Sequence, residues 1–235
     1  MLNLEELDFG YQIKCCQTPL NFNAKLGSFI SITGVNGVGK STLVKTIIGD
    51  IPVLNGQVFL KNRNVKSIDL EERAKLISIV TSKFYTSLNL TVKDVLLHAD
   101  IPNRKQFVYS NNFKFQEQIK TVLLELGIAE LINKQYALLS SGQQQLILIA
   151  RAILQNTDMI ILDEPTAFLD VKNKLLIFNM LQKLAQKGKL ILLISHDIDL
   201  VFKYSDSILF LDKHNYQIVD KKQVSLDDFY QMFSV

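Results

Sequence analysis

The feature that most constrains this chain is a glycine-rich stretch that ends in a lysine and two hydroxyl residues. Its residues are Gly34, Val35, Asn36, Gly37, Val38, Gly39, Lys40, Ser41 and Thr42. The apolar run at 28–33 predicts a buried strand before it, and residues 43–49 predict a helix that a glycine ends. Strand, glycine-rich turn and helix form the setting that a G-x-x-x-x-G-K-[ST] phosphate loop requires. We therefore expect a phosphate-binding loop rather than an incidental turn.

The parts of this loop have separate physical roles in holding phosphate. Glycines let the backbone turn tightly and point its N–H groups inward, and the N-terminus of the following helix adds positive potential. Lys40 is then placed to reach the β- and γ-phosphates of a nucleotide, and the Ser41 hydroxyl to bind Mg²⁺.

A second apolar run, at 159–162, leads directly into two carboxylates, Asp163 and Glu164. An isolated Asp-Glu pair is usually a solvated turn. After a buried strand, in a chain with a phosphate loop, it has the form of a Walker B segment. Asp163 would hold Mg²⁺ directly or through water, and Glu164 would act on an attacking water as general base.

Four apolar runs end at turns that carry chemically active residues. The runs end at Thr33, Val80, Leu162 and Ile194. Ligands of parallel α/β sheets bind beyond the carboxyl ends of the strands, so we expect these turns to meet at one site. His196 follows the last run. A lone histidine is more often structural or exposed, but this position predicts a contact with the γ-phosphate.

The N-terminal residues alternate partly between apolar and polar, which predicts an edge strand of an antiparallel sheet over 1–11. Tyr11 follows Gly10 at the end of this strand. The residues alone leave two interpretations of Tyr11 open: an aromatic ring that stacks on adenine, and a half-buried strand residue.

The rest of the chain alternates between predicted helices and strands, as an α/β fold requires. The predicted helices lie at 69–75, 91–98, 114–126, 146–154, 171–187 and 226–233, and further strands at 57–61, 76–80, 189–194, 207–211 and 216–219. Residues 81–89 and 100–112 read as irregular.

Composition excludes several classes of function. The 235 residues carry a net charge of 26 − 23 = +3, which is too mild to favour nucleic acid as a partner. The adjacent cysteines Cys15 and Cys16 cannot form an ordinary disulfide with each other, so we expect a reducing compartment. We see no signal peptide and no apolar run of the roughly 18 residues that span a bilayer.

The motif Leu-Ser-Ser-Gly-Gln at 139–143, between Lys40 and Asp163, adds a family resemblance. It resembles the signature motif of the ATP-binding-cassette (ABC) ATPases, and the resemblance covers essentially the whole chain. It implies an α/β fold with a P-loop NTPase (RecA-like) core, an antiparallel β edge subdomain and an inserted α-helical subdomain. We expect one nucleotide-binding domain over 1–235, with the core at about 1–87 and 156–235 and the helical subdomain at about 88–155.

The family also implies a head-to-tail dimer with two molecules of ATP, and Mg²⁺, between the subunits. By this resemblance Ser140, Gly142 and Gln143 would contact the γ-phosphate of ATP bound to the partner. Asp170 matches a loop that crosses the dimer interface. His196 matches the switch histidine, and Tyr11 matches the adenine-stacking aromatic residue.

Two departures from the family pattern stand out. Ser141 replaces the first glycine of the signature. Thr81 or Ser82 stands where the family has a glutamine that touches Mg²⁺ and the attacking water, so we take Ser82 as a candidate metal ligand. The phrase Thr-Ala-Phe-Leu-Asp at 166–170 is shared with importer ATPases for iron–siderophore and haem complexes, and the chain is most similar to these and the cobalamin importers.

The resemblance implies an ATPase subunit that drives a separate membrane permease from the cytoplasmic face of the inner membrane. The permease would fit a groove formed by residues 88–155 and the loop at Ser82, and an external substrate-binding protein would act through the permease. An export ATPase is the alternative. A soluble ATPase that acts on nucleic acid or ribosomes is disfavoured, because a charge of +3 provides no basic stripe.

Overall fold

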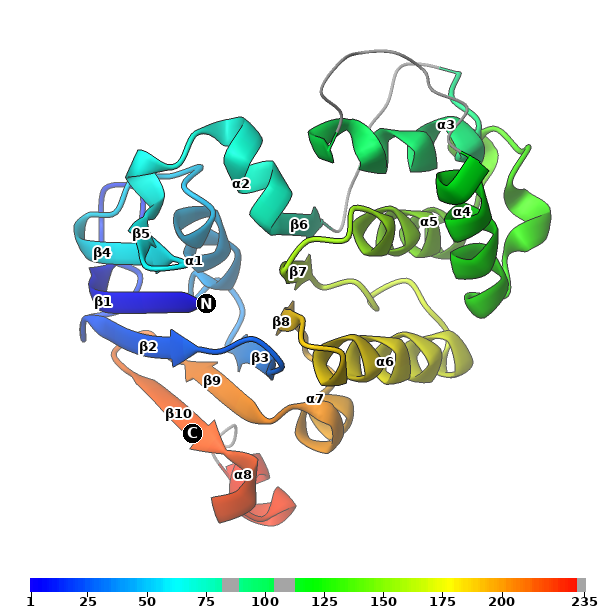
Figure 1. Cartoon of the computed structure of the whole chain (residues 1–235). Helices are drawn as coiled ribbons and strands as arrows, with labels where there is room; N and C mark the ends of the chain where they lie inside the picture. Colours follow the sequence, from blue (N-terminus) through cyan, green and yellow to red (C-terminus); the bar gives the residue numbers. More distant parts are fainter. Residues whose placement is uncertain (82–88, 104–112, 232–235) are drawn as a thin grey trace.

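The computed structural model describes residues 1–81, 89–103 and 113–231. Its centre is a six-stranded sheet in the order β10-β9-β3-β8-β7-β6 (Figure 1). All neighbouring strands are parallel except β10, which is antiparallel to β9. The strands are β3 (Phe29–Gly34), β6 (Ile77–Val80), β7 (Met159–Asp163), β8 (Leu190–Ile194), β9 (Ser207–Leu211) and β10 (Tyr216–Asp220).

The central strands are apolar throughout because both faces of the sheet are covered. Ile160 and Leu162 of β7 belong to the hydrophobic cluster on one face, whereas Met159 and Ile161 belong to the cluster on the other. Successive side chains of a strand point to opposite faces, so a strand buried on both sides reads as a continuous apolar run.

A second, four-stranded antiparallel sheet lies beside the first, in the order β2-β1-β4-β5. Its strands are β1 (Leu2–Asp8), β2 (Leu20–Ala24), β4 (Asn55–Leu60) and β5 (Arg63–Asn64). The prediction of an N-terminal edge strand is wrong, since β1 pairs with both β2 and β4. Alternation showed which side chains of β1 are buried but carried no information on how many strands flank it.

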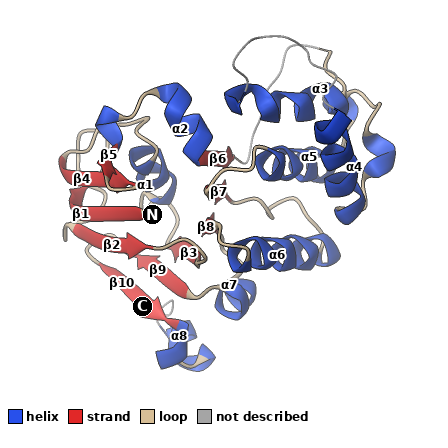
Figure 2. Ribbon diagram, in the orientation of Figure 1, coloured by secondary structure: helices blue, strands red, loops and turns tan. Residues whose placement is uncertain are grey.

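Some helices lie beside the antiparallel sheet, and the others gather on the side of the molecule away from it (Figure 2). They are α1 (Lys40–Ile47), α2 (Leu70–Leu76), α3 (Val92–Leu97), α4 (Phe113–Glu125), α5 (Ser141–Leu154), α6 (Val171–Gln186), α7 (Ile198–Tyr204) and α8 (Leu226–Gln231). Short 3₁₀ turns lie at 65–67, 98–103, 129–131, 136–138 and 221–223. Two predicted helix starts are confirmed: Asp69 accepts from the Glu72 N–H, and Thr91 forms a capping box with Asp94.

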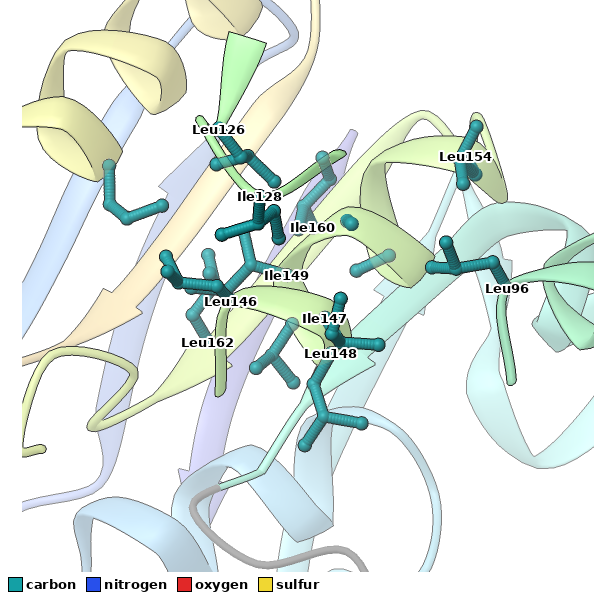
Figure 3. Packing of buried hydrophobic residues seen from close by; sticks show 14 of the residues in the cluster. Leu96, Leu126, Ile128, Leu146, Ile147, Leu148, Ile149, Leu154, Ile160 and Leu162 are labelled. Atoms are coloured by element: carbon teal, nitrogen blue, oxygen red, sulfur yellow. The ribbon is translucent and has the colours of Figure 1, made fainter. Parts of the chain in front are cut away.

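The helices α3, α4 and α5 lie between β6 and β7 in the chain and share a core with the sheet. Figure 3 shows Leu146 and Ile149 of α5 beside Ile160 and Leu162 of β7. Because α5 and β7 share this core, packing holds the N-terminus of α5 in place relative to β7. The subdomain boundaries given above stay a prediction.

The two cysteines, Cys15 and Cys16, are both free thiols. Among the described residues, no helix combines the length and the apolar character needed to cross a bilayer.

Candidate nucleotide site

The carboxyl ends of the predicted strands meet at one edge of the central sheet, as expected. In the register of the sheet, Ile194 lies opposite both Ile32 of β3 and Asp163 of β7, and Val80 of β6 lies opposite Leu162. The turns after β3, β7 and β8 therefore converge although they come from distant parts of the sequence. Thr81 follows β6 at the same edge, whereas Ser82 lies outside the described residues.

The phosphate loop runs from the end of β3 into α1 and needs glycine at two places. Gly34 has φ 141°, and a Cβ there would lie 2.0 Å from the Leu211 carbonyl oxygen. Gly39 has φ 105°, and a Cβ there would lie 2.7 Å from the Cys15 Sγ. No side chain caps the N-terminus of α1. Its first N–H groups therefore remain available to an anion.

Lys40 lies within the phosphate loop rather than in solvent, with 6% of its surface exposed. Its Nζ donates to the carbonyl oxygens of Gly34 at 3.0 Å and Val35 at 2.9 Å. Burial lowers the pKa of Lys40, and the carboxylates of Glu164 and Asp163 oppose this shift. A bound phosphate would supply the further negative charge that a buried ammonium group favours.

Asp163 and Ser41 face each other across the two motifs. The Ser41 hydroxyl lies near the Asp163 carboxylate, at the end of β7. Burial raises the pKa of Asp163, and the nearby Glu164 raises it further, against the opposing effects of Ser41, Lys40 and Lys45. A carboxylate and a hydroxyl are hard oxygen donors, and a bound cation stabilises the ionised form of a partly buried carboxylate. For both reasons this pair fits Mg²⁺.

Glu164 and His196 come together from the turns after β7 and β8. The His196 Nε2 lies 3.1 Å from the Glu164 Oε1, and 43% and 41% of these side chains are exposed. Glu164 has φ 50°, a left-handed conformation that is uncommon for residues other than glycine. Its N–H donates to the Ile194 carbonyl oxygen at 3.1 Å, which holds the strained residue at the edge of the sheet.

Tyr11 lies outside β1, in a turn beside α1, with 65% of its surface exposed. Its interpretation as a half-buried strand residue is therefore wrong. The Tyr11 hydroxyl accepts from Lys45 Nζ of α1 at 3.4 Å, and an ion pair of Lys14 with the buried Asp8 at 2.6 Å closes the turn. The ring is thus exposed near the phosphate loop, and its stacking on adenine stays a prediction.

The signature residues lie at the start of α5. Ser140 is the N-cap and forms a capping box with Gln143, in which the Ser140 Oγ accepts from the Gln143 N–H at 3.3 Å. A Cβ on Gly142 would lie 2.9 Å from the Phe168 carbonyl oxygen, so the signature contacts the loop that leads to Asp170. Asp170 itself caps α6 by accepting from the Asn173 N–H at 2.8 Å.

Ser141, the departure from the family signature, is the first residue of α5 and is exposed. Serine is compatible with helix geometry at this place and fits the first turn of α5. A contact of these residues with a partner's nucleotide stays a prediction, since the structure is of one chain.

Sequence reasoning missed four contacts of the site. The Asp197 carboxylate bonds Thr166 and Lys174, Lys45 reaches Tyr11, and Cys15 packs on the phosphate loop. None of these pairs has a spacing that a local pattern reveals, because the partners lie on different elements.

The comparisons with known proteins agree with this geometry. The sequence profile of the ABC transporter family matches residues 18–167. The iron(3+)-hydroxamate import ATP-binding protein FhuC of Bacillus subtilis is 30% identical over 90% of this chain and 79% of its own length. The manganese transport system ATP-binding protein MntB of Halalkalibacterium halodurans is 32% identical over 91% of this chain and 83% of its own length.

Solved structures give the same result. An inward-facing ABC transporter structure superposes with a TM-score of 0.83 at 27% identity, over 100% of this chain and 88% of that chain. A dimeric bacterial ABC transporter cassette has a TM-score of 0.83 at 26% identity, over 94% of this chain and 99% of that one. Motifs, site geometry and relatives thus agree: the chain belongs to the ABC transporter family and is an ATPase subunit of a transporter.

Proposed function

We propose that this ATPase drives the import of an iron complex, a siderophore or haem, through a separate permease. The observation that carries the catalytic part is the convergence of Lys40, the Ser41–Asp163 pair and the Glu164–His196 pair at one edge of the sheet. The iron substrate is supported by FhuC and by a Helicobacter pylori protein named for iron chelatin transport, which is 32% identical over 90% of this chain.

In this proposal each side chain of the site has a distinct task. Lys40 and the N–H groups of the phosphate loop bind and orient the β- and γ-phosphates. Glu164 orients the attacking water and accepts its proton, and His196 holds Glu164 and contacts the γ-phosphate. Ser41 and Asp163 hold Mg²⁺, which when bound neutralises charge on the phosphates.

We further propose that two chains form a head-to-tail dimer with ATP between them. Ser140, Gly142 and Gln143 then contact the γ-phosphate on the partner, and Asp170 lies in the interface. Three large apolar side chains near these residues are exposed in the single chain, Leu138 at 79%, Phe168 at 52% and Val171 at 73%. Such a group of exposed apolar side chains supports a surface that a partner covers.

The membrane partner is proposed to be a permease whose helix fits the region of residues 88–155, with the ATPase on the cytoplasmic face of the membrane. An external substrate-binding protein would deliver the iron complex to the permease. The identity of the cargo resides in those subunits, so the test must measure transport.

The test is radiolabelled uptake in cells that lack the gene for this protein. We expect the loss of uptake of a ferric siderophore or haem, with manganese uptake retained, and restoration by the wild-type gene but not by Glu164→Gln. The Gln variant is the matched control because it preserves the shape of the side chain. Loss of Mn²⁺ uptake alone would show that the transported substrate is manganese and not an iron complex. Accumulation of a substrate inside the cells would indicate export.

A further inference from the structure

A second bridge joins the turns after β7 and β8, next to the Glu164–His196 contact. The Thr166 hydroxyl donates to Asp197 Oδ2 at 3.0 Å. From α6, Lys174 Nζ donates to Asp197 Oδ1 at 2.9 Å. Thr166 is 2% exposed, and the Lys174 and Asp197 side chains are 25% and 30% exposed. Both carboxylate oxygens are therefore engaged in a region largely shielded from solvent.

The orientation of Asp197 is not the one that its own helix favours. Asp197 is the N-cap residue of α7, a position where an aspartate ordinarily accepts from the N–H groups of the first turn. Here the side chain makes no such bond, and its carboxylate is directed to Thr166 and Lys174. Its backbone N–H donates to the Ser195 Oγ at 3.1 Å, which fixes the turn around His196.

The three bridged residues each adjoin a part of the proposed machinery. Thr166 lies between Glu164 and Asp170, and Lys174 lies on the first turns of the helix that Asp170 caps. Asp197 directly follows His196. The bridge therefore connects two parts of the chain to the turn that carries His196. These parts are the turn that carries Glu164 and the 166–170 loop, which contacts the signature.

We propose that Asp197 is a positioning residue, whose carboxylate, held by Thr166 and Lys174, keeps His196 against Glu164 and fixes the 166–170 loop. The proposal rests on the roles given above to Glu164 and His196. Catalytic groups must be held closely, since a displacement of about 1 Å can cost roughly a hundredfold in rate. The Lys174 ion pair matters here as a geometric constraint, because it ties α6 to the turn that follows β8.

The test is steady-state hydrolysis of Mg²⁺-ATP by the full chain, with nucleotide affinity and Tm measured on the same samples. We expect Asp197→Ala to lower kcat by roughly tenfold to a hundredfold, with the Kd for ATP within about twofold of wild type. Asp197→Asn keeps an acceptor for Thr166 and loses the charge, so its kcat is intermediate. Lys174→Met is also intermediate, and Lys174→Arg restores activity.

Two further variants separate positioning from general stabilisation. The double variant Asp197→Ala/Lys174→Met should be no slower than Asp197→Ala, because both remove the same bridge. Lys183→Met removes an exposed lysine from the same helix and should retain wild-type kcat. If Asp197→Ala does not fold, Asp197→Asn and Lys174→Met carry the test.

An unchanged kcat in Asp197→Asn and Lys174→Met would overturn the proposal. So would a parallel fall of Tm, ATP affinity and kcat, which indicates a structural role. Failure of the catalytic assignment is distinguishable, because then Glu164→Gln would hydrolyse ATP at the wild-type rate.

Discussion

At the scale of single residues, Asp163 is the clearest case of a side chain kept in an environment that opposes its charge. Burial raises its pKa above the ordinary 3.8. A carboxyl with a raised pKa in the folded state destabilises the fold at neutral pH, where it must ionise. Asp163→Asn should therefore raise the Tm of the nucleotide-free protein at pH 7 by up to a few degrees, while Mg²⁺-dependent hydrolysis is lost.

The pH dependence of this gain has a definite sign. As the pH falls through the raised pKa toward 3.8, wild-type Asp163 becomes protonated and the difference in Tm between the two proteins disappears. Thermal unfolding of both proteins between pH 7 and pH 4, in the presence of a chelator, measures it. Asp50→Asn, at an exposed turn, is the control and should change Tm little. A lower Tm for Asp163→Asn at pH 7 would contradict the prediction.

The residues of the candidate site were largely predictable because each lies at the end of a buried strand or shortly after it. Parallel strands that end in turns with chemically active side chains place Lys40, Asp163 and His196 at the same edge of the sheet, and this inference needs no knowledge of strand order. The Asp197 bridge was not predictable, since Thr166 and Asp197 are 31 residues apart and meet only through packing. The placement of Tyr11 was missed because Gly10 forms a bridge with Lys14, which turns the chain after β1.

At the scale of elements, the contact between α5 and the 166–170 loop leads to a prediction about Gly142. A Cβ at this position would lie 2.9 Å from the Phe168 carbonyl oxygen, and a backbone atom cannot move without shifting its loop. Gly142→Ala should displace the loop that carries Asp170 and lower kcat at least about tenfold. The Kd for ATP should change less than about twofold, because the phosphate loop of the same chain is untouched.

The control is Ser141→Ala, which gives alanine at the preceding, exposed position but only removes a hydroxyl and adds no new Cβ. Its kcat should remain within about twofold of wild type. Steady-state kinetics and equilibrium ATP binding on the three proteins decide the matter, and equal effects of the two alanines would refute the steric explanation.

Most elements followed from periodicity, and the exceptions have physical causes. Residues 20–24 alternate between buried and exposed positions as a half-buried strand does, yet β2 was too short to stand out among its polar neighbours. Helix α7 was also absent from the prediction, although α2, which has the same length of seven residues, was predicted from its capping residue Asp69. Among the longer elements, α6 was predicted within one residue of its observed ends, whereas α5 begins at Ser141, before the apolar run at 146–154 that predicted it.

At the scale of the whole molecule, strand order was beyond the reach of local patterns. The order β10-β9-β3-β8-β7-β6 places β3 beside β8, strands separated by most of the chain. Such pairings depend on which helices cover which face, and no single segment encodes that. The family resemblance supplied the layout that periodicity did not provide.

The dimer is the largest structure that the proposal requires, and Glu164→Gln tests it. The amide keeps a hydrogen-bonding partner for His196 but cannot accept the proton of the attacking water, so ATP should remain uncleaved between the subunits. Light scattering after size exclusion should show this variant as a dimer, at twice the chain mass of 26.7 kDa, in the presence of Mg²⁺-ATP. With ADP it should have the mass of a single chain. Adding Lys40→Ala to Glu164→Gln removes the buried ammonium proposed to bind phosphate, so the double variant should stay monomeric with either nucleotide. If Glu164→Gln stays monomeric with ATP although it binds the nucleotide tightly, the γ-phosphate does not join two chains through Ser140, and the dimer proposal fails while the ATPase assignment stands.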